Sequence, residues 1–78
     1  MRLTAEQRRA LSTLAAAGPR GCVEALMVDA HGFTVEALAG LVRGGLASVE
    51  VKSVRAGRSP VEVIRMKITA AGLRALSQ

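Results

Sequence analysis

The sequence predicts one α+β domain that spans residues 1–78, in the order helix, helix, helix, strand, strand, helix. Two observations predict this class. In the first half of the chain, apolar residues recur at the spacing of three to four residues that is typical of helices. From Ala47 to Ile68, apolar and polar residues tend to alternate, as they do in strands with one buried face. Glycine-containing breaks, such as Gly18-Pro19 and Gly44-Gly45, separate the elements.

The first helix is expected to begin after Thr4. Thr4 and Gln7 have the spacing of a capping box, in which the Thr4 hydroxyl accepts the Gln7 amide and the Gln7 side chain reaches back. Gly18 then ends the helix as a left-handed cap, and Pro19 prevents its continuation. The residues predicted to face the core are Ala10, Leu11, Leu14 and Ala17.

Two shorter helices are predicted next. The second is expected to stop at His31-Gly32 and to bury Val23, Leu26, Met27 and Ala30. The third begins at Thr34, a good N-cap residue, with Phe33 packed as a hydrophobic staple on Leu38. It turns Leu38, Leu41 and Val42 inward and exposes Glu36, Ala37, Gly40 and Arg43, with Val35 beside them.

Residues 47–68 are predicted to form a β-hairpin with the two-residue loop Gly57-Arg58. Glycine at the first loop position suits a type II′ turn, because glycine adopts a positive φ readily. The loop fixes a register whose first face pairs Val51 with Ile64, Val49 with Met66 and Ala47 with Ile68. The second face sets Glu50 opposite Arg65, as a pair of opposite charges, and Val54 opposite Val61. Thr69 then caps a last helix that is expected to bury Leu73 and Leu76.

Composition restricts the function. The net charge of +5 is compatible with nucleic acid or another anionic partner, and equally with the arginine-rich coding of a GC-rich bacterial genome. The core must consist of small aliphatic side chains, because Phe33 is the only aromatic residue, and it offers little to a large cofactor; no cofactor is predicted. No stretch resembles a signal peptide or a membrane span, so we expect a cytoplasmic protein without a membrane partner.

Catalytic and metal sites are not expected. One cysteine and one histidine cannot supply a metal site or a catalytic triad, so no metal and no enzymatic activity are predicted. Cys22 is interpreted as a small buried hydrophobic residue at the start of the second helix rather than as a nucleophile. His31 is interpreted as a cap at the C-terminus of that helix.

The elements resemble the winged helix-turn-helix domains of bacterial transcription regulators, the multiple-antibiotic-resistance regulator (MarR) type among them. The resemblance rests on the helix end at Gly45-Leu46, on the hairpin over residues 49–67, and on the run ITAAGL at Ile68–Leu73, which looks like the family's strand-to-helix junction. It implies a winged helix in minimal form, without the family's dimerisation helices. It also implies a very short first strand near Arg20-Gly21 and a hairpin that serves as the wing.

This resemblance implies a small bacterial protein that binds double-stranded DNA or is associated with transcription. The hairpin residues Lys52, Arg55 and Arg58 are expected to hold phosphate, and Thr34 and Arg43 to place the third helix. Lys52 shares the outward face of the hairpin with Arg65 and Lys67. The alternative is that these charges keep an edge hairpin soluble and block the addition of another strand.

The competing function is a protein–protein interaction module without specific DNA binding. Of the exposed positions predicted on the third helix, only Arg43 has the donors that read bases, and Glu36 repels phosphate. The outward face of the hairpin carries Val54, Val61 and Val63 beside its basic residues, which predicts a homodimer contact or a protein partner there. The alternative is that the last helix or the N-terminal segment covers these valines.

Overall fold

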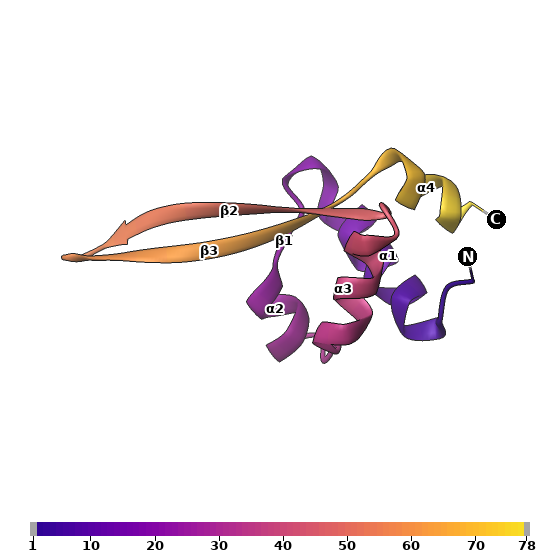
Figure 1. Cartoon of the computed structure of the whole chain (residues 1–78), viewed down its shortest axis with the longest axis horizontal. Helices are drawn as coiled ribbons and strands as arrows, with labels where there is room; N and C mark the ends of the chain where they lie inside the picture. The colour runs from indigo at the N-terminus through magenta and orange to yellow at the C-terminus, as the bar shows by residue number, and fades with distance from the viewer. Residues whose placement is uncertain (1, 78) are drawn as a thin grey trace.

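The computed structural model describes residues 2–77, apart from the Ala56 side chain, and these residues form a mixed α+β fold. A hairpin of two long strands projects from a group of helices, so that the molecule measures 46 Å along its longest axis and 22 and 21 Å across (Figure 1). Its elements are α1 (Ala5–Ala17), a 3-10 helix η1 (Gly18–Arg20), β1 (Cys22–Val23), α2 (Glu24–Asp29), α3 (Val35–Arg43), β2 (Ala47–Ala56), β3 (Ser59–Ile68) and α4 (Ala70–Leu76).

The hydrophobic core lies where the helices meet the base of the hairpin. The hairpin contributes Ala47 and Met66 as buried residues, with the partly buried Ile68 packed against this core, and α1 and α3 contribute most of the rest. The buried members of this core are Ala10, Leu11, Leu14, Met27, Phe33, Leu38, Leu41, Ala47 and Met66. In the part of the chain that the structure describes, no helix is long and apolar enough to cross a membrane.

Helix α1 begins as predicted. Gln7 N–H donates to the Thr4 hydroxyl at 3.0 Å, and Thr4 N–H donates to the Gln7 side chain at 3.1 Å, which completes the capping box. Leu11 and Leu14 are fully buried, whereas Ala17 is exposed, contrary to prediction. At the end of the helix, Gly18 has φ 73° and ψ −159°, so it does not have the left-handed helical conformation that we expected. Almost no residue other than glycine adopts these angles.

The segment after α1 differs from the prediction made from local periodicity, and the very short first strand that the resemblance implies near Arg20-Gly21 lies instead at Cys22–Val23. Cys22–Val23 is a short strand rather than the start of a helix, and α2 is only six residues long, with Met27 as its buried residue. Leu26 is 53% exposed and Ala30 is exposed, so the predicted apolar stripe is wrong for these two residues. The strand forms because β3 has a free edge at this place, a long-range partner that local periodicity does not report.

Helix α3 confirms the predicted cap and corrects the predicted surface. The Thr34 hydroxyl accepts from Ala37 N–H at 3.2 Å, and Phe33 and Leu38 are both buried. Ala37 is buried as well, and a Cβ added at Gly40 would lie 2.6 Å from Gln7 Nε2. The face with Ala37 and Gly40 is therefore covered by α1, since these small residues let the two helices approach closely.

The hairpin has the predicted register throughout. Val51 lies opposite Ile64, Glu50 opposite Arg65 and Val54 opposite Val61. Gly57, the first loop residue, has φ 66°, whereas Arg58, the second, does not have a positive φ. This is the combination of signs that a type II′ turn requires. Strand β3 is central, in the antiparallel order β1-β3-β2, with Cys22 opposite Met66 at the base of the hairpin.

Helix α4 returns the chain to the body. The Thr69 hydroxyl accepts from Gly72 N–H at 3.1 Å, as predicted, and donates to Gly45 O at 2.7 Å. Gly72 is buried, and a Cβ there would overlap the Leu46 carbonyl oxygen. Leu76 packs against the core, but Leu73 is 50% exposed and corrects the prediction that α4 buries both leucines.

Candidate nucleic-acid interface

A basic cleft lies at the base of the hairpin, between η1 and the two long strands. Its volume is about 410 Å³ and its lining residues are Pro19, Arg20, Glu50, Lys52, Arg65 and Lys67. The strand residues reach the same face because side chains alternate along each strand and the register sets Glu50 opposite Arg65. Four cations and one carboxylate give the lining a formal net charge of +3.

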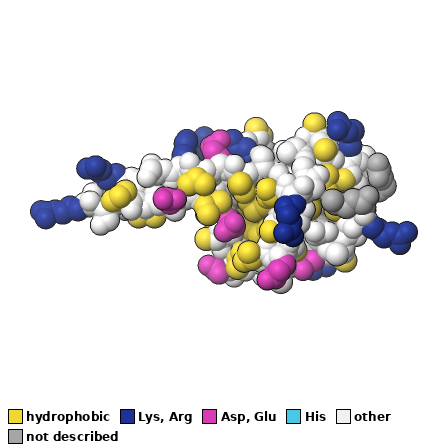
Figure 2. All heavy atoms as spheres, in the orientation of Figure 1, with side chains coloured by type: hydrophobic (Ala, Val, Ile, Leu, Met, Phe, Trp, Pro, Cys, Tyr) yellow, Lys and Arg dark blue, Asp and Glu magenta, His cyan; other side chains and the backbone are white. Residues whose placement is uncertain are grey.

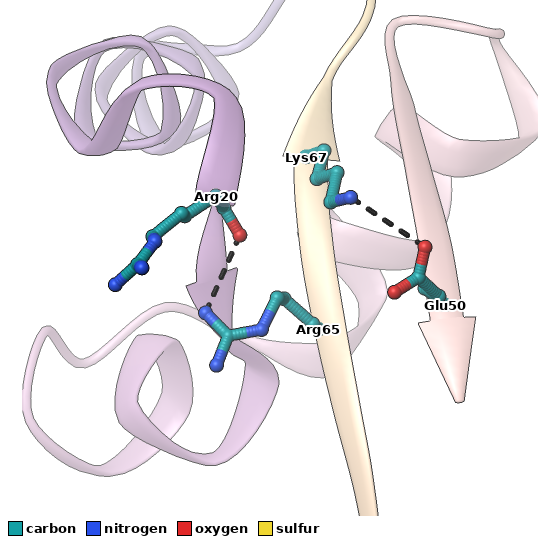
Figure 3. A network of polar contacts seen from close by, with 4 residues as sticks. All are labelled: Arg20, Glu50, Arg65 and Lys67. Carbon is teal, nitrogen blue, oxygen red and sulfur yellow. Dashed lines mark hydrogen bonds and ion pairs between the residues drawn. The ribbon is translucent and has the colours of Figure 1, made fainter. Parts of the chain in front are cut away.

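Strand β1 brings Arg20 to this cleft. Gly21, which follows Arg20, approaches β3 so closely that a Cβ would overlap the Met66 carbonyl oxygen, and its φ of 69° also favours glycine. Arg65 Nη1 donates to the Arg20 carbonyl oxygen at 3.3 Å, so the hairpin also fixes η1 by a side-chain contact (Figure 3). In Figure 3 the Arg20 side chain extends away from Arg65 and from the two strands, and it forms no ion pair among the described residues.

The ion pair at the hairpin base differs from the predicted one. The Cα positions of Glu50 and Arg65 are opposite each other, but Glu50 Oε2 pairs with Lys67 Nζ at 3.5 Å (Figure 3). Arg65 turns to the other side, toward η1. Glu50 therefore pairs with its diagonal neighbour Lys67 and not with Arg65, which is directly opposite. Diagonal neighbours on a sheet are within reach of long side chains.

A second group of cations lies at the tip of the hairpin. Arg58 is in the turn, and Arg55 is opposite Pro60 on the face of the sheet that also carries Val51. Both arginines are exposed. Figure 2 shows Lys and Arg side chains at the far end of the hairpin and again above its base, so basic charge is found at both ends of the projecting arm.

Helix α3 does not join this basic surface. Thr34 and Arg43 lie at opposite ends of α3, and the Thr34 backbone N–H donates to Glu6 Oε2 at 2.6 Å. The backbone N–H and the hydroxyl of Thr34 thus each have a structural partner. Arg43 and Glu36 are exposed on α3, and Figure 2 shows Asp and Glu side chains gathered over α2 and α3. The predicted set of five DNA-binding residues is therefore divided, with Lys52, Arg55 and Arg58 on the hairpin and Thr34 and Arg43 on the helix.

The valines of the predicted partner contact are only partly together. Val54 and Val61 face each other across the strands and are 48% and 46% exposed. Val63 is half-buried, and with Val61 it lines a depression of about 320 Å³ beside the start of α2. The alternative that α4 or the N-terminal segment covers Val54 and Val61 is wrong, since both remain exposed.

Other residues singled out in the sequence have structural surroundings. Cys22 lies half-buried in β1, and His31 is exposed and stacks on Phe33 with a ring-centroid distance of 6.0 Å. His31 N–H donates to Leu26 O at 3.1 Å just beyond α2. Among residues 2–77, no three His, Cys, Asp or Glu side chains are grouped so as to hold a metal ion.

Sequence reasoning missed Arg20 as a member of the basic cleft. Its only local signal is its place after Gly18-Pro19, and its position depends on the pairing of β1 with β3. Comparison of the chain with family models, with curated proteins and with solved structures gives no match. The site must therefore be interpreted from its own chemistry.

Proposed function

We propose that this chain forms a winged helix-turn-helix domain of the bacterial transcription-regulator type and that its hairpin binds double-stranded DNA. The observation that supports this proposal is the distribution of cations along the projecting hairpin. Arg20, Lys52, Arg65 and Lys67 surround the cleft at its base, and Arg55 and Arg58 lie at its tip. A duplex carries one negative charge per about 1.7 Å of its axis, so the cations that share the cleft face can contact several phosphates at once. Arg55 lies on the opposite face of the sheet, so its contact with DNA would be separate from that of the cleft.

The contacts of this surface would be mostly with the DNA backbone. Its donors are arginine and lysine side chains on exposed strands, which position a protein on the duplex but carry little sequence information. Helix α3 adds few base-reading groups, because Ala37 and Gly40 pack against α1 and Glu36 repels phosphate. The proposed activity is therefore binding that depends strongly on salt and weakly on sequence.

The test is binding to a mixed-sequence labelled duplex, measured by fluorescence anisotropy from about 50 to 200 mM salt. Wild type is compared with Arg55→Ala/Arg58→Ala and with Lys52→Ala, whose side chains are exposed. We expect steep loss of affinity with salt in wild type. The slope of log K against log salt should become shallower by about 0.9 for each phosphate contact removed.

The matched control is Arg8→Ala/Arg9→Ala. It removes the same charge as the tip variant, but from exposed positions on α1 outside the hairpin and its cleft. This control should keep most of the affinity and the slope. Equal losses in the two double variants would show attraction by net charge alone, and absence of binding by wild type at the lowest salt would refute the proposal.

A protein-interaction module is the second candidate function. It is favoured by the exposed valine pair Val54–Val61 and by the acidic surroundings of α3, neither of which phosphate binding explains. In this case the partner would contact the outward face of the hairpin. Wild type would then fail to bind the duplex at low salt, and the hairpin would be a docking surface for protein.

A further inference from the structure

The outer edge of β2 is the least protected edge of the sheet. On the other side, β3 is covered at its base by β1, and near the tip it carries Pro60, which has no N–H to offer another strand. Strand β2 has neither protection over its ten residues, and residues 48–55 are all exposed. Edges of this kind pair readily with another strand.

The register shows which backbone groups this edge presents. A two-residue hairpin loop is closed by a hydrogen-bonded pair, here Ala56 with Ser59, and such pairs alternate along the ladder. The N–H and C=O groups of Val49, Val51 and Ser53 therefore point away from β3. The same alternation turns the backbone groups of Met66 outward on β3, and Met66 is where β1 pairs with it.

We propose that two copies of this chain associate through β2, antiparallel and with Val51 of one copy opposite Val51 of the other. In this register Glu50 of each copy lies opposite Lys52 of the other, which gives two cross-strand pairs of opposite charge. Moving the two-fold axis by one residue sets two Glu50 side chains, or two Lys52 side chains, against each other. The charges on β2 therefore allow one register and oppose its neighbours.

The same arrangement covers apolar surface on the hairpin. Val51 is 57% exposed and Val49 is 47% exposed, and each would gain a neighbour across the new strand pair. The two-fold axis of such a pair is perpendicular to the sheet, so the same face of each copy lies on the same side. Both basic clefts would then belong to one surface of a six-stranded sheet. This association goes beyond the proposed function and needs no nucleic acid.

The experiment is sedimentation-velocity analysis of the full chain without nucleic acid, from about 5 to 500 µM, since small interfaces are typical of weak complexes. Wild type should form more dimer as its concentration rises. Val51 is exposed, so Val51→Glu and Val51→Lys leave the core intact. Each variant should be monomeric, because residue 51 of one copy lies opposite residue 51 of the other and the two like charges repel. An equimolar mixture of these two variants should form heterodimers.

A second pair of variants tests the charge pairing. Lys52→Glu alone places a carboxylate opposite Glu50 of the other copy at each of the two pairs and should weaken association about ten-fold. Mixing it with Glu50→Lys restores opposite charges at both pairs and should restore the dimer. Circular dichroism checks that each variant is folded, because Glu50→Lys also removes the ion pair with Lys67.

Either of two results would overturn the proposal. The first is a wild type that stays monomeric over the whole concentration range. The second is a dimer that persists in Val51→Glu and Val51→Lys, since it must then use another surface. Because no DNA is present, failure here leaves the duplex-binding result unaffected, and failure of duplex binding leaves this result unaffected.

Discussion

The helical body and the distal hairpin are stabilised in different ways. In the body, Leu11, Leu14 and Leu41 are fully buried, and hydroxyl caps at Thr4, Thr34 and Thr69 satisfy the helix starts. Toward the tip of the hairpin, residues 48–55 and 57–62 are all exposed, and they include valines on both faces of the sheet. Strand pairing alone supports this arm, whereas burial of side chains stabilises the body.

This difference is consistent with the roles proposed for the two regions. A hairpin that contributed only to stability would need to extend no further than Ala47 and Met66, which are its buried core residues. The remaining length carries basic residues, exposed valines and an open strand edge, which are features of a contact surface. Variants of the body should therefore change the free energy of unfolding, and variants of the distal hairpin should change association.

The largest effect is expected at the junction of the two regions. Gly21→Ala combines a positive φ with overlap between the new Cβ and the Met66 carbonyl oxygen. We expect a loss of about 5 kcal/mol, a large part of the roughly 4–12 kcal/mol of stability that is typical of a chain of this length. Urea unfolding followed by circular dichroism measures the loss.

Gly18→Ala is the matched control for this variant. Gly18 has φ 73° and ψ −159°, and Gly21 has φ 69° and ψ −157°, but no atom lies within 4 Å of a Cβ at Gly18. The control carries the backbone strain without the overlap and should lose only about 1–3 kcal/mol. Equal losses in the two variants would contradict the role given to the contact between Gly21 and β3.

The next effect compares one leucine of the body with one valine of the arm. Leu14→Ala leaves a cavity in the core and should cost about 2–5 kcal/mol. Val51→Ala, at a position that is 57% exposed, should change the free energy of unfolding by less than about 0.5 kcal/mol at concentrations where the chain is monomeric. Urea denaturation of both variants tests this, and a loss above about 2 kcal/mol in Val51→Ala would mean that the arm contributes to the core.

The sequence was sufficient where local chemistry decides the structure. The capping box at Thr4, the N-caps at Thr34 and Thr69, the turn at Gly57 and the hairpin register follow from neighbouring residues and from the period of two in strands. It was insufficient where distant contacts decide. Cys22–Val23 became a strand because β3 had a free edge, and Ala37 became buried because Gln7 and its helix α1 cover it.

The candidate site was also predictable where local pattern decides a residue's position, and not where distant contacts decide it. The exposed positions of Lys52, Arg55 and Arg58 on the hairpin were predicted correctly, since positions in a known register can be assigned from the sequence. Arg20 could not be found, because its place in the cleft depends on the pairing of β1. The contact between Glu6 and the Thr34 amide also joins residues 28 apart and has no local signal.

A smaller effect is expected at the cap that joins the hairpin to α4. The Thr69 hydroxyl accepts from Gly72 N–H and donates to Gly45 O, so Thr69→Ala removes two hydrogen bonds and should cost about 1–2 kcal/mol. Thr69→Ser keeps the hydroxyl and should recover most of this loss. Thermal unfolding of the three proteins measures it. If serine were no better than alanine, the cap would owe its effect to the methyl group of threonine.

The smallest effect is expected from the ion pair at the hairpin base, for which a double-mutant cycle with Glu50→Ala and Lys67→Ala is the measurement. The two side chains are 50% and 36% exposed and 3.5 Å apart. Water therefore screens their attraction, and the coupling free energy should be only about 0.2–1 kcal/mol and should fall as salt rises. The cycle is needed because Lys67→Ala also removes the aliphatic part of the side chain beside Gly21. A coupling free energy above about 2 kcal/mol would mean that this ion pair contributes substantially to the stability of the fold.

A small coupling free energy leaves both charges available for other contacts, Lys67 for a phosphate in the cleft and Glu50 for Lys52 of a second copy.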